Sequence, residues 1–547
     1  MSVHPKLRVL APVAAALAVV AAAGALAADK PARAKPAETP ELLEQGRAVY
    51  FRRCSFCHGL LGDGDGPAAE FLDPRPRDFT LGTYKFRTTQ SGKLPTDEDL
   101  FRTVSRGLSG TAMQAFDNEI IKNGLTEDER WAVIAWIKTF APEFKNPEYD
   151  PYKRQVALPK GMPASSAATI AKGREVFEKA KCWECHGKQG RGDGQKAFDR
   201  TDDWGFPIRI RNVTHPWKIK GGTEVEDIYM RFTTGINGTP MPSFIEGVPS
   251  EEDRWALATY IKSLQHKQTE HQVLKPLRVE GALPAAPDDA AWAKAPPMDV
   301  RLAGQVTAPP RWQNPSIELV TVRAVANDKE IAFLLQWDDP FKDAVHDEKA
   351  ELDAKELTKT GGYSSYVDPY EMVPRKLETF RDAVALQFPL KLLEGTKRPH
   401  FLRGDASNPV QLWRWKADLE EQGKRSVEEA VARGWKQPPK PLAEKHQLVA
   451  GKAEWKDGRW SVVMQRALVT PDGSGVQFAP GVFVPMAINV WDGSNGEHGL
   501  LMSVSTWQYV FIEAPVPARV YGYAGFAVLA TGLLGVGLMR KAQRSGS

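Results

Sequence analysis

A five-residue pattern, Cys-x-x-Cys-His, occurs twice in this chain and uses all of its cysteines. The two copies are residues 54–58 and 182–186. Two thiols at this spacing can add to the vinyl groups of a haem, and the adjacent histidine can then bind the iron from one face. A zinc knuckle would need two further ligands for each cysteine pair, while a redox dithiol or a disulfide has no need of the histidine. We therefore expect two covalent haem c groups, attached through Cys54, Cys57, Cys182 and Cys185 and ligated by His58 and His186.

A methionine follows each motif at the same distance. The separation of Met113 from His58 equals the separation of Met241 from His186. Both methionines end a Gly-Thr-x-Met segment. A thioether favours reduced iron, and it fills the second axial position, which leaves no open site for oxygen or peroxide. We predict that Met113 and Met241 are the second iron ligands, although a single methionine would more often be a packing residue.

The two halves of this region form a repeat, because the two motifs and the two methionines are offset along the chain by the same number of positions. The repeat also includes the elements around the predicted ligands. Each half predicts a helix, a haem loop, a glycine- and proline-rich loop, a methionine loop and a final helix. The final helices start at Thr126 and Ser250, which are N-cap residues followed by acidic side chains. The helices are expected at residues 40–53, 126–140, 169–181 and 250–264.

This arrangement resembles the class I cytochrome c domain over residues 40–142 and 168–266. The resemblance implies that the first and last helices of each domain cross, and that His and Met ligate the haem iron. It also implies that Trp131 and Trp255 pack near the haem. Between the two domains, the proline- and charge-rich residues 143–167 are predicted to be a linker.

Residues 1–28 are typical of a secretory signal peptide. They begin with basic residues, continue with an Ala/Val/Leu run and end in small residues, so we expect cleavage after Ala27 or Ala28. An uncleaved anchor is the alternative. Residues 29–39 are predicted to be a tether rich in Ala, Pro and Lys.

A second apolar run, residues 520–539, contains no charged residue. It is long enough to cross a bilayer as a helix, and basic residues follow it. Positive charge is favoured on the cytoplasmic side, which predicts that residues 540–547 lie in the cytoplasm and the rest of the chain lies on the periplasmic side of a bacterial inner membrane. Basic and acidic side chains nearly balance, at 72 and 68, and no basic tract supports nucleic-acid binding.

After residue 264 the helical periodicity gives way to alternation of apolar and polar residues. Residues 317–325 alternate, 327–328 predict a turn, and 330–337 return as a strand. Further strands are expected at 383–388, 459–469, 482–491 and 502–511. We predict an all-β, sandwich-like domain over residues 276–514. The predicted fold class is multidomain, with two all-α domains, one all-β domain and one C-terminal transmembrane helix.

This β region resembles the haem-binding domain of the ethylbenzene dehydrogenase γ-subunit family. The resemblance is carried by residues 382–389, 404–416, 457–463, 489–493 and 503–507. Members of the family bind one non-covalent haem b between their sheets, typically through Met and Lys. They exchange electrons with a molybdenum enzyme through an iron–sulfur subunit.

The chain departs from this family pattern at both ligand positions. Residues 399–404, where the family's Met usually lies, contain none, and residues 500–503 lack the usual Lys. His400 and Met502 lie at or beside these positions, and we predict that they bind the iron of a haem b. The alternative is that the haem b has been lost and the domain docks a partner. The fallback ligands are Met464, Met486, His446 and His498.

These features favour an electron-transfer protein over a catalytic subunit, because six-coordinate haems conduct electrons and do little bond chemistry. We expect redox-protein partners, either a molybdenum oxidoreductase with an iron–sulfur subunit or a quinol-oxidising complex. A dihaem peroxidase-like enzyme is a weaker alternative, because such enzymes differentiate their two haems and the two units here share one ligand pattern. A sensor or scaffold is weaker still.

Overall fold

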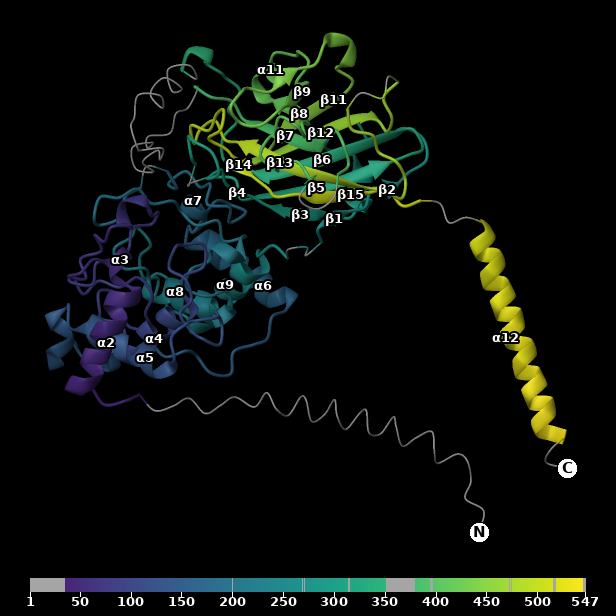
Figure 1. Ribbon diagram of the computed structural model, residues 1–547. Coiled ribbons are helices and arrows are strands. Elements are labelled where there is room, and N and C mark those ends of the chain that lie inside the picture. The colour runs from purple at the N-terminus through teal and green to yellow at the C-terminus, as the bar shows by residue number, and fades with distance from the viewer. Residues whose placement is uncertain are drawn as a thin grey trace.

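The computed structural model describes residues 35–544 except 199, 268, 270, 313–314, 351–378, 394–396, 472, 474 and 515–517. The predicted signal peptide lies outside these residues. Figure 1 shows a helical region, a β domain above it and a separate C-terminal helix. The helical region holds the two units that contain the Cys-x-x-Cys-His motifs.

The first unit is built from α-helices that surround an apolar cluster containing Val49, Tyr50, Leu100, Val104 and Ile134. Its α-helices are α2 (Pro40–Arg53), α3 (Ser55–His58), α4 (Asp97–Arg106) and α5 (Glu127–Lys138). Its short 3₁₀ helices, including those of the linker, are η2 (Ala69–Phe71), η3 (Pro142–Lys145), η4 (Pro147–Tyr149) and η5 (Pro151–Arg154).

The second unit repeats this arrangement. Its helices are α6 (Ala167–Lys179), α7 (Trp183–His186), η6 (Pro216–Lys218), α8 (Val225–Thr234) and α9 (Glu251–Ser263). The first and last helices of each unit pack at a glycine, since a Cβ on Gly46 or Gly173 would overlap the carbonyl oxygen of Ala132 or Ala256. The predicted helix crossing is thus present in both units.

Helices α4 and α8 occupy the stretch for which the sequence predicts a glycine- and proline-rich loop. Helix α4 begins with a capping box, in which the Thr96 hydroxyl accepts from the Asp99 amide and the Asp99 carboxylate accepts from the Thr96 amide. One face of α4 is apolar, with Leu100 and Val104 buried. The glycine and proline residues lie around these helices rather than inside them, which is why the general composition of the stretch concealed them.

The two units form a close interface. The guanidinium of Arg87, which is fully buried, donates to the carbonyls of Thr234 (2.8 Å) and Gly235 (3.2 Å). In the other direction, Arg231 donates to the Arg87 carbonyl (2.7 Å). The methionine loop of the second unit begins at Gly235, so this interface holds it against the first unit.

The β domain consists of two sheets. Within the described residues one sheet has nine strands, along the order β1-β15-β13-β7-β8-β9-β10, with β14 paired to β13 and β4 paired to β14. The other has six, along the order β11-β12-β6-β5-β2 with β3 beside β5. The bounds are β1 (Val273–Leu274), β2 (Leu277–Arg278), β3 (Met298–Arg301), β4 (Ala303–Gly304), β5 (Leu319–Ala326), β6 (Glu330–Asp338), β7 (Ala383–Pro389), β8 (Val410–Lys416), β9 (Val427–Ala432), β10 (Lys440–Pro441), β11 (Ala450–Trp455), β12 (Arg459–Ala467), β13 (Phe483–Trp491), β14 (Ser503–Val504) and β15 (Gln508–Phe511). The short helices of the domain are η7 (Ala290–Lys294), α11 (Ala417–Glu421) and η9 (Glu444–His446).

An apolar core joins the sheets and includes Phe333, Trp337, Trp413, Trp415 and Trp460. The structure confirms the predicted sandwich-like fold, and strands β5, β6, β7, β12 and β13 closely match the expected ranges. The expected strand over 502–511 is divided into β14 and β15, which lie at different positions along β13.

The second unit contacts the β domain through polar residues. Asp338, at the end of β6, is 3.4 Å from the Arg191 guanidinium, 3.7 Å from His215 and 2.8 Å from Arg459 of its own domain. Farther along, His266 is 2.7 Å from the Asp299 carboxylate. The second unit therefore contacts both the first unit and the β domain.

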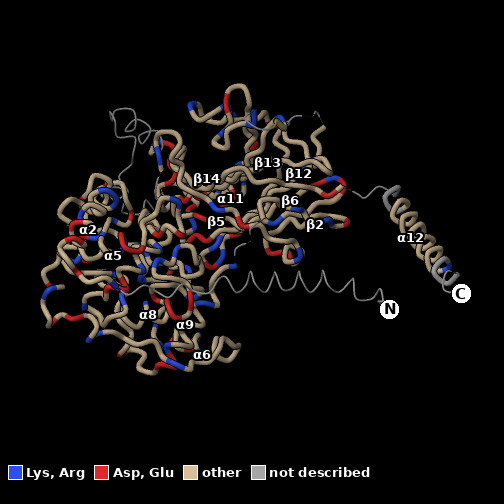
Figure 2. Tube along the Cα trace, turned by 60° about the horizontal axis from the view of Figure 1, so that its bottom comes forward, with Lys and Arg blue, Asp and Glu red and all other residues tan. Residues whose placement is uncertain are grey.

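Helix α12 (Ala518–Arg544) stands apart from the rest of the chain (Figure 1). Its segment Gly522–Arg540 is long and apolar enough to cross a membrane by length and composition, and it is not buried against the body. Figure 2 shows acidic and basic residues interspersed over the body, whereas most of α12 carries neither colour. This is the helix that the sequence predicts to be membrane-spanning.

Candidate haem sites

The first unit contains a cavity of about 290 Å³ between its haem motif and its methionine loop. Cys54, Cys57, His58 and Met113 all line this cavity. Its other walls are largely apolar, with Phe79, Leu100, Val104, Phe116 and Ile137. The fold thus brings the four residues predicted to hold the first haem to one apolar space.

The orientation of His58 is set by the backbone. Its Nδ1 lies 2.9 Å from the carbonyl oxygen of Arg77, so Nδ1 carries the proton and donates, leaving the Nε2 lone pair available to a metal. Burial lowers the pKa of His58, which favours the neutral ring. The ring also stacks on Phe79, with centroids 4.5 Å apart.

The second unit orients its histidine in the same way. The Nδ1 of His186 lies 3.0 Å from the carbonyl oxygen of Arg211, and burial lowers the pKa of the ring. These two carbonyls were missed in the sequence analysis. Their residues end similar Arg-x-Arg segments, 75–77 and 209–211, but they follow His58 by 19 residues and His186 by 25. A comparison at fixed spacing therefore does not align them.

None of the four cysteines forms a disulfide. Burial raises the pKa of Cys54 and of Cys182 to about 12, so both thiols stay protonated at neutral pH. The turns that carry them are tight, because the amides of His58 and His186 donate to the carbonyls of Cys54 and Cys182, each at 2.9 Å.

The two methionine loops share one geometry. The Met113 carbonyl accepts from the Leu108 amide (2.8 Å), and the Met241 carbonyl accepts from the Ile236 amide (3.0 Å). Each methionine amide donates to the hydroxyl of the threonine two residues earlier, at 3.1 Å in the first loop and 3.3 Å in the second. Both methionines pack against the apolar cluster of their unit. Matched hydrogen bonds thus hold Met113 and Met241 in equivalent positions.

The residues around the first cavity fit a haem. The cavity is apolar where a porphyrin ring would lie, and the basic side chains of Arg77, Lys85 and Lys220 occur among its lining residues. The buried hydroxyl of Tyr84, which also lines the cavity, has no hydrogen-bond partner among the described residues. An anionic propionate would satisfy this donor and the cations together.

In the β domain, the two predicted haem b ligands border one apolar cluster. Met502 is fully buried in this cluster with Leu402 and Trp491. The ring of His400 packs on Phe401 (4.4 Å between centroids) and Trp435 (5.6 Å), and both of these aromatics pack against the same cluster. The Nδ1 of His400 accepts from the Leu402 amide at 3.0 Å. Ligation by this pair stays a prediction.

The fallback ligands lie elsewhere in the domain. Met464 and Met486 are fully buried in the core between the sheets. His446 ends the short helix η9, and His498 stacks on Phe380 with centroids 4.2 Å apart.

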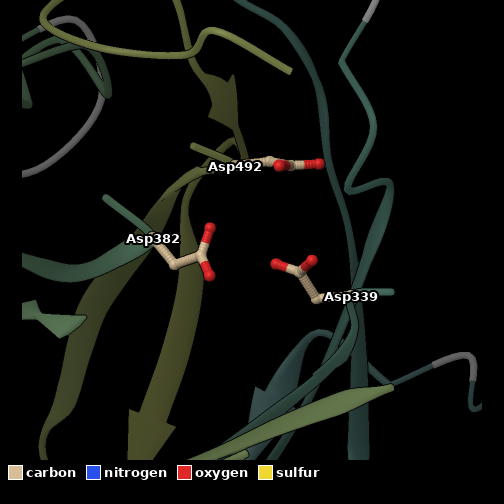
Figure 3. A group of neighbouring side chains, drawn as sticks. All are labelled: Asp339, Asp382 and Asp492. Atoms are coloured by element: carbon tan, nitrogen blue, oxygen red, sulfur yellow. The ribbon is translucent and has the colours of Figure 1, made fainter. Parts of the chain in front are cut away.

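Three carboxylates that the sequence analysis did not group meet in the β domain (Figure 3). Asp339 follows β6, Asp382 precedes β7, and Asp492 follows β13, yet each offers an oxygen within 4.8 Å of the others. All three are buried. Burial raises the pKa of Asp339 and of Asp382 well above the ordinary range, and repulsion from neighbouring carboxylates, including Asp492 and the nearby Asp343, adds to this. No local sequence signal could have grouped them, because β7 and β13 pair in one sheet whereas β6 belongs to the other, so the three segments meet only where the two sheets pack.

Comparisons with known protein families agree with this architecture. The cytochrome c family matches residues 43–141 and 170–265. The ethylbenzene dehydrogenase family matches residues 289–437 and 432–503.

Individual proteins with similar sequences include a candidate respiratory nitrate reductase haem subunit of Haloferax mediterranei. It is 27% identical over 264 residues, which cover 47% of this chain and 81% of that protein. The CcoP subunit of a cbb3-type cytochrome c oxidase from Helicobacter pylori is 24% identical over 39% of this chain and 61% of its own length. A chain of the reducing HAO-like protein complex of Kuenenia stuttgartiensis has 44% identity over 42% of this chain and 100% of its own, with a TM-score of 0.38.

The two family matches, with the nitrate reductase haem subunit and the CcoP relatives, identify a multihaem electron-transfer cytochrome. In particular, the chain combines two tandem cytochrome c domains with an ethylbenzene dehydrogenase-like domain. Both resemblances inferred from the sequence are thereby confirmed, as is the predicted fold class.

Proposed function

We propose that this protein is a membrane-anchored carrier that passes electrons between a respiratory oxidoreductase complex and other redox proteins. The observation that carries the proposal is the matched pair of His and Met loops, one pair in each cytochrome c domain. Haem groups supply reversible one-electron chemistry at such sites. The protein's own contribution is to position them, exclude water and set their potentials.

Each proposed residue has one role. Cys54, Cys57, Cys182 and Cys185 attach two haem c groups covalently. His58 and His186 bind the irons through Nε2, held by the Arg77 and Arg211 carbonyls. Met113 and Met241 complete the coordination and raise the potentials relative to a second histidine.

The domain arrangement supports a continuous route for electrons. The second cytochrome c domain contacts the first through Arg87 and Arg231, and it contacts the β domain through Asp338 and Asp299. We propose that the β domain holds a haem b through His400 and Met502, which would extend the route by a third centre.

The proposed location is the periplasmic side of a bacterial inner membrane. Helix α12 would anchor the protein, and the basic residues after 539 favour a cytoplasmic C-terminus. The predicted signal peptide and the domain boundaries are part of the same proposal. The partner would be a molybdenum oxidoreductase with an iron–sulfur subunit or a quinol-oxidising complex, as the ethylbenzene dehydrogenase-like domain and the nitrate reductase haem relative suggest.

A pyridine haemochrome spectrum of the detergent-solubilised protein tests this proposal, with acidified acetone used to extract non-covalent haem. We expect two covalent c-type haems and one extractable b-type haem for each chain. The absence of covalent haem would overturn the carrier function. Two c-type haems without haem b would instead support the second candidate, in which the β domain only docks the redox partner.

A further inference from the structure

One residue of the second cytochrome c domain lines the haem cavity of the first. Lys220 stands among the lining residues of the cavity that contains His58 and Met113, and the other lining residues all come from 53–137. Among the residues that the structure describes, none forms a hydrogen bond or ion pair with the Lys220 ammonium. A half-buried ammonium at a cavity wall thus lacks a direct anionic partner in the described part of the protein.

Close packing sets the position of Lys220. A Cβ on the next residue, Gly221, would meet the Phe86 ring of the first domain at 3.1 Å, and a Cβ on Gly110 would meet the Lys218 side chain at 2.5 Å. The loop 218–222 therefore lies directly against the first domain. These close approaches show that Lys220 is carried by a segment packed against the first domain.

The cations around Lys220 make this wall strongly positive. Burial, followed by the nearby Arg211 and Lys85, lowers the pKa of Lys220 to about 7. Burial and Arg77 lower the pKa of Lys85 to about 8. Acidic residues offset only part of this positive charge. Asp202 is 3.8 Å from Lys85. Asp73 raises the pKa of Lys220, but it forms no described ion pair with it. An additional anion at this wall would relieve the repulsion among the cations.

The same group of cations also reaches the second haem site. Arg211 lies close enough to Lys220 to lower its pKa, and its carbonyl orients His186. Lys220 therefore lines the first cavity and also lies near Arg211, the residue whose carbonyl orients the proximal histidine of the second domain. A charge at this position acts on both sites, and its action is strongest on the cavity that it lines.

We propose that Lys220 is a positioning residue that binds a propionate carboxylate of the haem held by Cys54 and Cys57, together with Lys85 and Arg77, and so links the two cytochrome c domains electrostatically. This inference rests on the proposed haem c function. An ammonium beside a propionate changes the midpoint potential of the haem iron less directly than an axial ligand does. The sign of the change nevertheless follows from the positive charge of the ammonium. Removing the positive charge favours the ferric state and lowers the midpoint potential.

The test is a potentiometric titration of the full-length, haem-loaded protein and of its Lys220→Gln variant. The transition of the first haem is assigned with Met113→His, which lowers the potential of that haem alone. We expect Lys220→Gln to lower the midpoint potential of the first haem, with a smaller change or none at the second. Lys220→Arg keeps the charge and should restore the parent value.

Lys172→Gln is the matched control, because it removes the same charge from an exposed position on α6 of the same domain. It should leave both potentials unchanged. The inference would be overturned if Lys220→Gln carried both covalent haems and yet kept both potentials, or shifted only the second. Failure of the parent protein to attach haem would instead overturn the proposed function itself, and with it this inference.

Discussion

Gly46 of α2 lies against the carbonyl oxygen of Ala132 in α5, and a Cβ on Gly46 would overlap that oxygen. Gly173 and Ala256 repeat this relationship in the second cytochrome c domain. The crossing of the first and last helices thus depends on the absence of a side chain at one position in each domain. Because α2 leads directly into the haem motif, the same contact positions Cys54.

We predict that Gly46→Ala destabilises the first cytochrome c domain by about 1–3 kcal/mol or more, because the added methyl group forces the helices apart. Thermal unfolding followed by circular dichroism measures this change, and covalent haem content reports its effect on the site. Gly247→Ala is the control, since a Cβ there would meet only the Phe244 ring, at 3.6 Å. Equal stability of the two variants would contradict the prediction.

The methionine loops lead to a second prediction. Met113→His should lower the midpoint potential of one haem, within the roughly 0.8 V range that axial ligands span, because imidazole stabilises ferric iron better than a thioether does. Spectroelectrochemistry measures the potential. The control is Met230→Leu in α8, which changes a buried core methionine that does not line the described cavity. An unchanged potential in Met113→His would show that Met113 is not a ligand.

The acidic residues of the β domain predict a pH-dependent stability. Burial, followed by repulsion from Asp492, raises the pKa of Glu497 to about 7 from its ordinary value of 4.5. The folded state therefore favours the protonated acid, whereas the unfolded chain ionises above pH 4.5. The contribution of Glu497 is fully present below pH 4.5 and is lost as the pH rises to about 7, with a total change of about 3 kcal/mol.

Denaturant titrations of the protein at pH 4.5, 5.5 and 7 would measure this loss. The Glu497→Gln variant should show a smaller change of unfolding free energy over the same interval, because it cannot ionise. The exposed Glu513→Gln serves as the control. A pH dependence that is identical in Glu497→Gln and in the parent would exclude Glu497 as its source.

We predict that helix α12 holds the protein in the membrane fraction of the cell. A chain that ends at residue 514 should appear in the soluble fraction, whereas the full-length chain should stay with the membranes after washing with high salt and leave them only in detergent. The reason is the transfer free energy of an uncharged span long enough to cross the bilayer. Immunoblots of the fractions decide between these outcomes. Release of the full-length chain by salt alone would show that α12 is not inserted.

Much of the fold could be predicted from local patterns. Helix α2 has the expected bounds, and strands β5, β6 and β13 lie within a few residues of their predicted ranges. These elements have strong periodicity and clear caps or turns. Helices α4 and α8 were missed, because the glycine and proline residues around them dominate the composition of their region. The expected strand over 502–511 was divided, because β14 and β15 pair with different parts of β13.

The sequence by itself was enough to predict the chemistry at the two Cys-x-x-Cys-His motifs. The thiols, the histidine and the methionine recur at identical spacing, so the two units can be recognised without coordinates. Only the tertiary structure decided which residues surround the predicted ligands. The Arg77 and Arg211 carbonyls follow their histidines at unequal distances, Lys220 reaches its cavity from another domain, and three strands bring Asp339, Asp382 and Asp492 together. The physical reason is that a covalent motif depends on neighbours along the chain, whereas burial and electrostatics depend on neighbours in space.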